Sequence, residues 1–404
     1  MPSPSSRRSL TAALWITLAA LQSGCTTSAV APTANAPGDD ALVGDWMMAI
    51  KAELELPTRG LLHISKSSDG QLHVSQDDLS TPEKDEPLPL KNVTVDHGIV
   101  SIGETLHGSM DTDHNRIQGT FKVNGTLDRL LAHVLGDNTE LPLVMTRVDP
   151  AHPPQRLQGH DYTVAGHHIH YLEVAGSTAA RILFIHGSPG EADNWNPYLT
   201  DPALQQRATL IAVDRPGFGQ SEPGQVITSL RDQARLLEPL LRGSPADAHI
   251  PTILVGWSEG GPIAAEMAMD YPDEVQAALL EAPAIDPEHD GAQWYNHAAA
   301  FWPIGKLVSG LMGEGFMWSN QEMMALQPQL KTMEPRWQAL KMPIAVIQGE
   351  ADDLVDPRTA DFAQRVLPAK GWIVRVPGVG HGVPFTLTAL AALNQTLTDL
   401  AGRQ

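Results

Sequence analysis

Residues 251–265 read PTILVGWSEGGPIAA, and this stretch decides the fold. The apolar run of residues 252–255 predicts a strand buried on both faces, and residues 263–271 have a helical pattern. Between them lies a G-x-S-x-G motif, Gly256-Trp257-Ser258-Glu259-Gly260. A turn this sharp forces Ser258 into a strained backbone conformation, and the two glycines let strand and helix approach without a Cβ clash. We therefore expect the turn to hold the hydroxyl of Ser258 where a substrate can reach it.

A serine hydroxyl becomes a strong nucleophile only when a base removes its proton and a carboxylate orients that base. Residues 378–382, GVGHG, place His381 on a glycine-rich loop after the last expected strand. Asp352 and Asp353 both follow the preceding expected strand. The chain order serine, acid, histidine is typical of a serine on a G-x-S-x-G turn. The sequence therefore predicts a catalytic triad of Ser258, His381 and one of these two aspartates.

A tetrahedral intermediate formed at this serine needs two backbone N–H donors for its oxyanion. Glu259, the residue after the nucleophile, supplies one at the positive end of a helix. We expect its carboxylate to form a salt bridge or to contact solvent rather than to tune the site electrostatically. Residues 186–190, HGSPG, follow the apolar run of residues 182–185. The N–H of Ser188 is the expected second donor, and His186 is expected to shape this loop.

The rest of the C-terminal part alternates apolar runs with helical stretches. The runs are nearly continuously apolar, which predicts strands buried on both faces. Strand–helix–strand repetition predicts a parallel sheet with right-handed crossovers. The clearest further helix covers residues 230–242. The expected strands are residues 182–185, 209–213, 252–255, 277–280, 344–347 and 372–376.

Together with residues 214–221, DRPGFGQS, these motifs resemble those of the α/β-hydrolase superfamily over residues 160 to 402. The resemblance is specific, because four motifs occur in the right order on the right elements. It implies an α/β-hydrolase fold with a mostly parallel eight-stranded sheet. It also implies a triad of Ser258, Asp352 and His381, since the spacing of Asp352 from Gly349 fits the family better than that of Asp353.

Two branches of the superfamily fit this sequence less well. Haloalkane dehalogenases and epoxide hydrolases use an aspartate nucleophile, which Ser258 disfavours. Proline iminopeptidases share a His-Gly-x-Pro-Gly loop, but residues 256–260 depart from their usual Gly-Gly-Ser-Trp-Gly. Residues 288–341 lie where the superfamily inserts its helical lid. Five apolar side chains in this lid either line an acyl pocket or only bury the lid on the domain: Trp294, Trp302, Met312, Met317 and Trp318.

Residues 41–148 have a different pattern, in which short β-prone runs alternate with turn signals such as Asp69-Gly70. This pattern predicts a small antiparallel sheet or open barrel. It resembles the small β-domain that precedes the catalytic domain in some exported bacterial serine hydrolases, with Gly44-Asp45-Trp46 at its start. Residues 149–158 contain three prolines and are predicted to link this domain to residues 159–402.

The first 24 residues are predicted to be a signal peptide. Arg7 and Arg8 precede an apolar run of residues 10–21, and Cys25 would become the first residue after cleavage. This arrangement resembles a bacterial lipoprotein signal, which implies lipidation of Cys25 and anchoring in the cell envelope. A plain secretory signal or a partial twin-arginine signal are the alternatives. Residues 25–40, rich in Ala, Pro and Thr, are predicted to be a flexible tether.

Composition excludes several classes of protein. The chain of 404 residues has a net charge of -20, which argues against a nucleic-acid partner. A single cysteine argues against disulfide scaffolds and thiolate metal sites. His160, His167, His168 and His170 cluster in the sequence, but we expect an exposed β-hairpin there rather than a metal site. No phosphate-binding G-x-x-x-x-G-K-[ST] motif occurs, so no nucleotide cofactor is implied. No metal or other cofactor is expected.

These features predict an exported serine hydrolase that cleaves a small-molecule apolar ester through an acyl-enzyme intermediate. The chain is expected to meet the membrane only through a lipid anchor at Cys25, because no later apolar run is long enough to span a bilayer. Two alternatives stay open. One is an amidase or an aminopeptidase of the proline-iminopeptidase type, which would use the same residues. The other is a non-catalytic binding protein that kept the fold.

Overall fold

The structure is a computed structural model, and it describes most of the chain after residue 39. The chain divides into two compact units, Met1–Leu79 with Glu83–Pro153 and Ser80–Pro82 with Pro154–Gln404. The expected signal peptide, Cys25 and nearly all of the expected tether lie outside the described residues, so these stay predictions. No helix within the described ranges is long and apolar enough to cross a membrane. The described residues are 40–51, 56–81, 88–90, 93–96, 98–103, 105–122, 140–242, 250–301, 306, 308–310 and 313–402.

The first unit is built on one antiparallel sheet, as its alternating sequence pattern predicts. In β8 (Arg116–Lys122), for example, Ile117 and Phe121 are buried and the residues around them are more exposed. Within the described residues the strands follow the order β4-β3-β2-β1-β9-β8-β7-β6-β5. A short 3₁₀ helix, η2 (Asp40–Leu42), precedes them. The other strands are β1 (Gly44–Ile50), β2 (Thr58–Lys66), β3 (Leu72–Asp77), β4 (Leu88–Leu90), β5 (Val93–Asp96), β6 (Ile99–Ile102), β7 (Leu106–Met110) and β9 (Glu140–Arg147).

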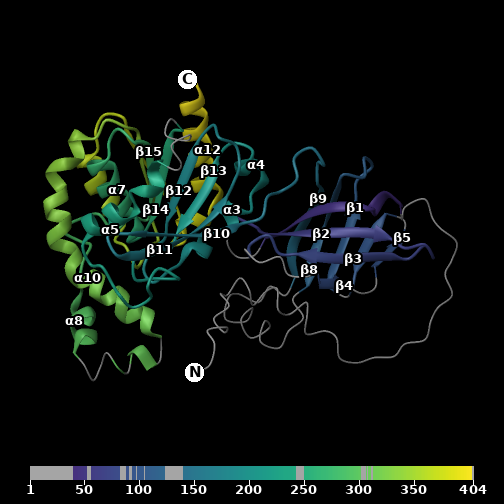
Figure 1. Cartoon of the computed structure of the whole chain (residues 1–404), viewed down its shortest axis with the longest axis horizontal. Helices are drawn as coiled ribbons and strands as arrows, with labels where there is room; N and C mark the ends of the chain where they lie inside the picture. Colours follow the sequence, from purple (N-terminus) through teal and green to yellow (C-terminus); the bar gives the residue numbers. More distant parts are fainter. Residues whose placement is uncertain are drawn as a thin grey trace. The chain divides into compact units, whose positions relative to one another are not determined.

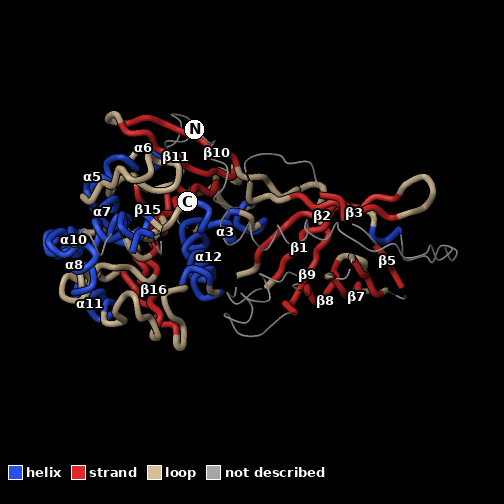
Figure 2. The backbone as a smooth tube through the Cα atoms, turned by 90° about the horizontal axis from the view of Figure 1, so that it is seen from below, coloured by secondary structure: helices blue, strands red, loops and turns tan. Residues whose placement is uncertain are grey.

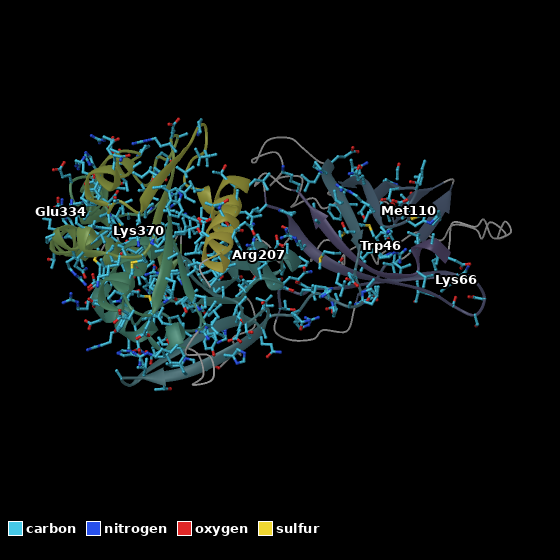
Figure 3. The ribbon with its side chains drawn as sticks, turned by 90° about the horizontal axis from the view of Figure 1, so that it is seen from above. Trp46, Lys66, Met110, Arg207, Glu334 and Lys370 are labelled. Carbon is cyan, nitrogen blue, oxygen red and sulfur yellow. The ribbon has the colours of Figure 1, made fainter. Side chains whose placement is uncertain are left out.

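Trp46 anchors the core of this unit. Its side chain is completely buried among the strands (Figure 3). The indole Nε1 donates a hydrogen bond to the carbonyl oxygen of Leu42 at 2.8 Å, and the guanidinium of Arg147 lies 4.4 Å from the ring centroid. The polar atom of a large buried side chain is thereby satisfied, which lets the ring fill the core without an unpaired donor.

The second unit contains a sheet with the strand order β10-β11-β13-β12-β14-β15-β16-β17. The five pairings that join β13 through β17 are parallel, and β10 and β11 add an antiparallel edge. The central strands are buried along their whole length, which explains their continuous apolar runs. The strands are β10 (Gln158–Val164), β11 (His167–Val174), β12 (Arg181–Ile185), β13 (Thr209–Val213), β14 (Thr252–Trp257), β15 (Val275–Glu281), β16 (Ile344–Gly349) and β17 (Gly371–Val376).

Helices cover both faces of this sheet. Figures 1 and 2 place α5 (Leu230–Leu237) and α7 (Gly260–Asp270) on one side and α3 (Asn196–Leu199) and α12 (Leu387–Ala401) on the other. The α/β-hydrolase fold and the preceding antiparallel β region agree with the sequence analysis. The remaining elements are η3 (Ala192–Trp195), α4 (Pro202–Gln205), α6 (Pro239–Arg242), α8 (Trp294–Ala300), α10 (Glu314–Met333), η5 (Glu334–Ala339), α11 (Thr359–Val366) and η6 (Val383–Phe385).

Two of the differences from the expected element boundaries have a clear physical reason. The single helix expected over residues 230–242 is divided into α5 and α6, because Pro239 has no N–H to continue the helical ladder and its ring clashes with the preceding turn. The linker expected over residues 149–158 gives way to β10 at Gln158. This edge strand is mostly exposed, so no apolar run marks it in the sequence.

The last helix, α12, is fixed directly after the loop that carries His381. Thr386 caps its N-terminus by accepting a hydrogen bond from the backbone N–H of Ala389 at 3.2 Å. Arg207, labelled in Figure 3, donates to the side chains of Asn394 at 2.7 Å and Thr398 at 2.9 Å. These contacts anchor the chain on the C-terminal side of His381, which restricts the positions that its loop can take.

Candidate active site

Ser258 occupies the turn between β14 and α7 with a left-handed backbone conformation, φ 55°. Such a conformation costs a non-glycine residue roughly 1–3 kcal/mol. Backbone hydrogen bonds hold the turn: Ser258 N–H donates to the carbonyl of Glu281 at 3.0 Å, and the Ser258 carbonyl accepts from Gly261 and Ala284. A Cβ on Gly256 would lie 2.4 Å from the carbonyl oxygen of Gly260, so this turn requires glycine there. The strained turn predicted from the motif is therefore present.

Asp352 and His381 form a hydrogen-bonded pair. The imidazole Nδ1 lies 2.9 Å from Asp352 Oδ2, and the aspartate side chain is fully buried. Asp352 Oδ1 accepts hydrogen bonds from the backbone N–H groups of Leu354 at 2.9 Å and Val355 at 3.0 Å, and Gln348 Nε2 donates to Oδ2 at 3.2 Å. Four donors thus fix the carboxylate in the orientation that holds the imidazole.

The same contacts determine the charge of Asp352. Burial raises the pKa of its carboxyl group, but the hydrogen bond and the charge of His381, with the amides of Val355 and Leu354, outweigh that effect and lower the pKa below its ordinary value. Asp352 is therefore ionised at neutral pH. Asp353, the competing acid in the sequence, is exposed. The structure thus brings His381 together with Asp352.

The loop of His381 also lies against the serine turn. Trp257 Nε1 donates to the backbone carbonyl of His381 at 3.0 Å, and the two rings lie 5.5 Å apart between centroids. The imidazole is not hydrogen-bonded to the hydroxyl of Ser258, although the structure describes both residues. Such catalytic hydrogen bonds are often long in the absence of substrate and shorten in the complex. Trp257, the residue before the expected nucleophile, therefore connects the serine turn to the loop that carries the expected base.

The HGSPG loop packs directly on the serine. A Cβ on Gly187 would lie 2.9 Å from the Cβ of Ser258, so only glycine allows this approach. His186 is completely buried, and its Nε2 accepts from the backbone N–H of Arg215 at 3.0 Å. Its Nδ1 then carries the proton and donates to the Gly187 carbonyl at 2.6 Å. Burial and the nearby charge of Arg215 lower the pKa of His186 well below its ordinary value, so a neutral imidazole shapes this loop.

A buried ion pair joins the DRPGFGQS motif to α10, which lies in the expected lid, and sequence reasoning missed it. Arg215, in the DRPGFGQS motif, lies with its Nη1 2.7 Å from Glu322 Oε1 on α10, and both side chains are inaccessible to solvent. The two residues are 107 positions apart in the chain. An acidic residue on a polar helix gives no signal of such a partner, because most of these residues face solvent. The hydroxyl of Ser188 lies next to this pair and donates a hydrogen bond to Glu322 Oε2 at 2.6 Å.

Glu259 does not form the salt bridge or solvent contact that we expected. Its side chain is buried, and Oε2 has no hydrogen-bond partner among the residues that the structure describes. Burial and the charges of Glu322 and Asp290 raise the pKa of Glu259 well above its ordinary value, although Arg215 opposes them. Burial thus favours the protonated form of this carboxyl group. The expectation was wrong because the turn after Ser258 directs this side chain inward.

The histidines near the start of the second unit are not simply an exposed hairpin. His168 and His170 share the same carboxylate oxygen, Asp161 Oδ1, at 3.2 Å and 2.9 Å. His170 is buried, contrary to expectation, because the DRPGFGQS loop covers it: Gln220 Nε2 lies 3.2 Å from its Nε2, and the hydroxyl of Ser221 accepts from its backbone N–H. Within the described ranges, no group of three or more His, Cys, Asp or Glu side chains is arranged to hold a metal ion.

The segment expected to form a lid, residues 288–341, contains α8, α10 and η5. Trp318 is half-buried and packs edge-on against Phe218 at 6.1 Å between centroids. This contact favours the role of burying the lid on the domain. Met317 is also half-buried. Trp302, Met312 and the side chain of Trp294 lie outside the described residues, so the question of an acyl pocket stays open for them.

Glu281, at the end of β15, is a buried carboxyl group whose pKa makes protein stability depend on pH. Its side chain is completely buried, and neither carboxylate oxygen has a partner among the described residues. Burial raises its pKa from 4.5 to about 8. The folded protein therefore keeps this proton up to about pH 8, whereas the unfolded chain releases it near pH 4.5. The contribution of Glu281 to the free energy of unfolding therefore falls as the pH rises through this window.

We expect Glu281→Gln to remove this pH dependence. Between pH 5 and pH 8 the unfolding free energy of the wild type should fall by roughly 3 kcal/mol more than that of the variant. Chemical denaturation at both pH values measures the difference. Glu314→Gln, a substitution at an exposed position of α10, is the matched control and should behave like the wild type. An equal pH response of Glu281→Gln and wild type would contradict the assignment.

Comparison with known proteins places this architecture. Residues 182–395 match the sequence profile described as Alpha/beta hydrolase family. A curated relative, the dihydrolipoyllysine-residue acetyltransferase component of the acetoin cleaving system of Cupriavidus necator, is 36% identical over 121 residues, which are 30% of this chain and 30% of that protein. The chain thus spans under a third of the length of this relative.

Two solved structures illustrate the range of similar proteins. A haloalkane dehalogenase from Agrobacterium tumefaciens is 16% identical with a TM-score of 0.49, covering 60% of this chain and 97% of that one. A thermophilic esterase from Thermogutta terrifontis is 18% identical with a TM-score of 0.46, covering 60% and 99%. The family profile extends over more than half of the chain, from β12 into α12. The chain therefore belongs to the Alpha/beta hydrolase family.

Proposed function

We propose that this protein is a serine hydrolase that cleaves a carboxylic ester of a small or medium apolar acid through an acyl-enzyme intermediate. Ser258 is the nucleophile, His381 the general base and Asp352 the residue that orients it. The observation that carries the proposal is the 2.9 Å contact between His381 Nδ1 and a buried, ionised Asp352, beside a serine held at φ 55°. A structural serine has no need of either feature.

The proposed reaction begins with proton transfer. Because Asp352 accepts the Nδ1–H of His381, the Nε2 lone pair is free to take the proton from Ser258 Oγ as that oxygen attacks the ester carbonyl. The backbone N–H groups of Glu259 and Ser188 would stabilise the oxyanion. His381 then gives the proton to the leaving alcohol, which leaves an acyl group on Ser258. Water, activated by the same imidazole, releases the acid and restores the serine.

Labelling with a fluorophosphonate probe tests this proposal. The probe phosphonylates a serine only where a base activates it, so we expect stoichiometric labelling of the wild type and a modified peptide that contains Ser258. Ser258→Ala should abolish the labelling. Ser177→Ala, on the loop between β11 and β12, is the control and should be labelled like the wild type. Folded wild-type protein that resists the probe would favour the alternative of a non-catalytic binding protein.

A further inference from the structure

A buried polar network joins α10 to the HGSPG loop, which carries the expected oxyanion donor Ser188. Glu322, on α10, makes a two-point contact with Arg215: Oε1 lies 2.7 Å from Nη1 and Oε2 lies 3.0 Å from Nη2. Gln233 Nε2 donates to the same Oε1 at 3.0 Å. Two-point arginine–carboxylate contacts fix orientation as well as distance, because both groups are planar. Arg215 is therefore held rigidly although it lies in a loop.

Arg215 in turn holds the peptide group that contains the expected oxyanion donor. Its Nη2 donates to the carbonyl oxygen of Gly187 at 3.1 Å, and His186 Nδ1 donates to the same oxygen at 2.6 Å. The carbonyl of Gly187 and the N–H of Ser188 belong to one planar peptide unit and point in opposite directions. Fixing the carbonyl from one side therefore fixes the direction in which the Ser188 N–H points.

The side chain of Ser188 supplies a second attachment to α10. Its hydroxyl donates to Glu322 Oε2 at 2.6 Å and lies 2.8 Å from the hydroxyl of Ser319. Ser319 and Glu322 are three residues apart and so share one face of the helix. Arg215 thus holds the carbonyl of the peptide unit between Gly187 and Ser188, and Glu322 holds the side chain of Ser188.

We propose that Glu322 is a positioning residue for the oxyanion-binding N–H of Ser188, acting through Arg215 and through the Ser188 hydroxyl. This inference rests on the proposed function and extends it to the lid. The helix α10 is then a fixed part of the catalytic apparatus at this point. Separating it from the loop would leave a buried guanidinium and a buried carboxylate each without its oppositely charged partner.

Two variants test the inference. Ser188→Ala keeps the backbone N–H but removes the hydrogen bond from the Ser188 hydroxyl to Glu322. Glu322→Gln weakens both this hydrogen bond and the contact with Arg215. Removing one oxyanion donor outright costs about 10²–10³ in kcat, so misdirecting it should lower kcat by roughly 10-fold in Ser188→Ala and by up to about 100-fold in Glu322→Gln. KM should change by less than about twofold, because the ester in its ground state does not use this donor fully. The affinity for a trifluoromethyl ketone that forms a tetrahedral adduct should fall with kcat.

Gln329→Ala is the matched control on the same helix. Gln329 ties α10 to the start of α5, with its Oε1 accepting from Leu230 N–H at 2.7 Å and its Nε2 donating to the Thr228 carbonyl at 2.8 Å. If general loosening of the lid explained the effect, this variant would show it too. We expect its kcat and inhibitor affinity to match the wild type.

The outcomes separate the inference from the proposed function. Absence of fluorophosphonate labelling in the wild type would overturn both. Normal labelling, combined with wild-type kcat and inhibitor affinity in Ser188→Ala, would overturn the inference alone. A raised KM at unchanged kcat would also overturn it, since that pattern indicates lost ground-state binding. If Glu322→Gln does not fold, Ser188→Ala and Gln329→Ala decide the question between them.

Discussion

Replacing Ser258 with alanine should lower kcat for ester hydrolysis by about 10⁶, the loss seen when a triad nucleophile is removed from a serine hydrolase. The variant keeps a Cβ at φ 55°, so the turn and its backbone hydrogen bonds should survive. The oxyanion donors remain, and they should leave a residual rate roughly 10³–10⁴ above that in water. Initial rates on a chromogenic ester with a short apolar acyl chain, normalised to folded protein, measure the loss.

The control for this prediction is stability. The melting temperature of Ser258→Ala should equal or exceed that of the wild type, because the substitution removes no hydrogen bond that the structure shows for the hydroxyl. The same assay with a matched anilide distinguishes an esterase from an amidase, since both would lose activity with Ser258. Full turnover in the alanine variant would refute the assignment of the nucleophile.

Asp352→Asn should lower kcat by about 10⁴ while the fold is preserved. An asparagine that presents its amide nitrogen to His381 Nδ1 would favour the tautomer with the proton on Nε2, and that nitrogen could then not accept the serine proton. The low pKa of Asp352 supports this expectation, because the wild-type residue is a carboxylate that only accepts hydrogen bonds. Steady-state kinetics over pH 5–9 measure the effect.

Asp353→Asn is the matched control for this substitution. The two aspartates are neighbours, but Asp352 is buried and paired with His381 whereas Asp353 is exposed. Its kcat should stay within about twofold of the wild type. A loss of similar size in Asp353→Asn, or none in Asp352→Asn, would show that His381 relies on a different acid in solution.

Much of the fold could be predicted because its signals are local. A strand buried on both faces is apolar along its length, as β12 and β16 are, and a tight turn that needs glycine records that need within five residues. Such patterns do not depend on which distant segment packs nearby. The positions of Ser258 and His381 in the chain could be proposed for the same reason, whereas the choice of Asp352 over Asp353 came from the resemblance to the superfamily.

The features that were missed depend on contacts between distant segments. Glu322 meets Arg215 across more than one hundred residues, and nothing on its own helix marks it as buried. His170 is buried because the DRPGFGQS loop folds over it, which its strand pattern does not reveal. The side chain of Glu259 turns inward among other charged groups, although an acid at a helix start ordinarily faces water. Each case requires the tertiary neighbours to be known first.

The left-handed backbone at Ser258 limits how far the thermal stability of this protein could be raised without loss of the proposed activity. Glycine at that position would relax the turn and strengthen the fold, but it would remove the oxygen that we propose as the nucleophile. Thermal stability must therefore be raised by substitutions at other positions. Exposed apolar positions such as Phe301, which is 64% exposed, are better candidates. Selection for thermal stability alone should therefore enrich inactive variants that carry substitutions at the serine turn.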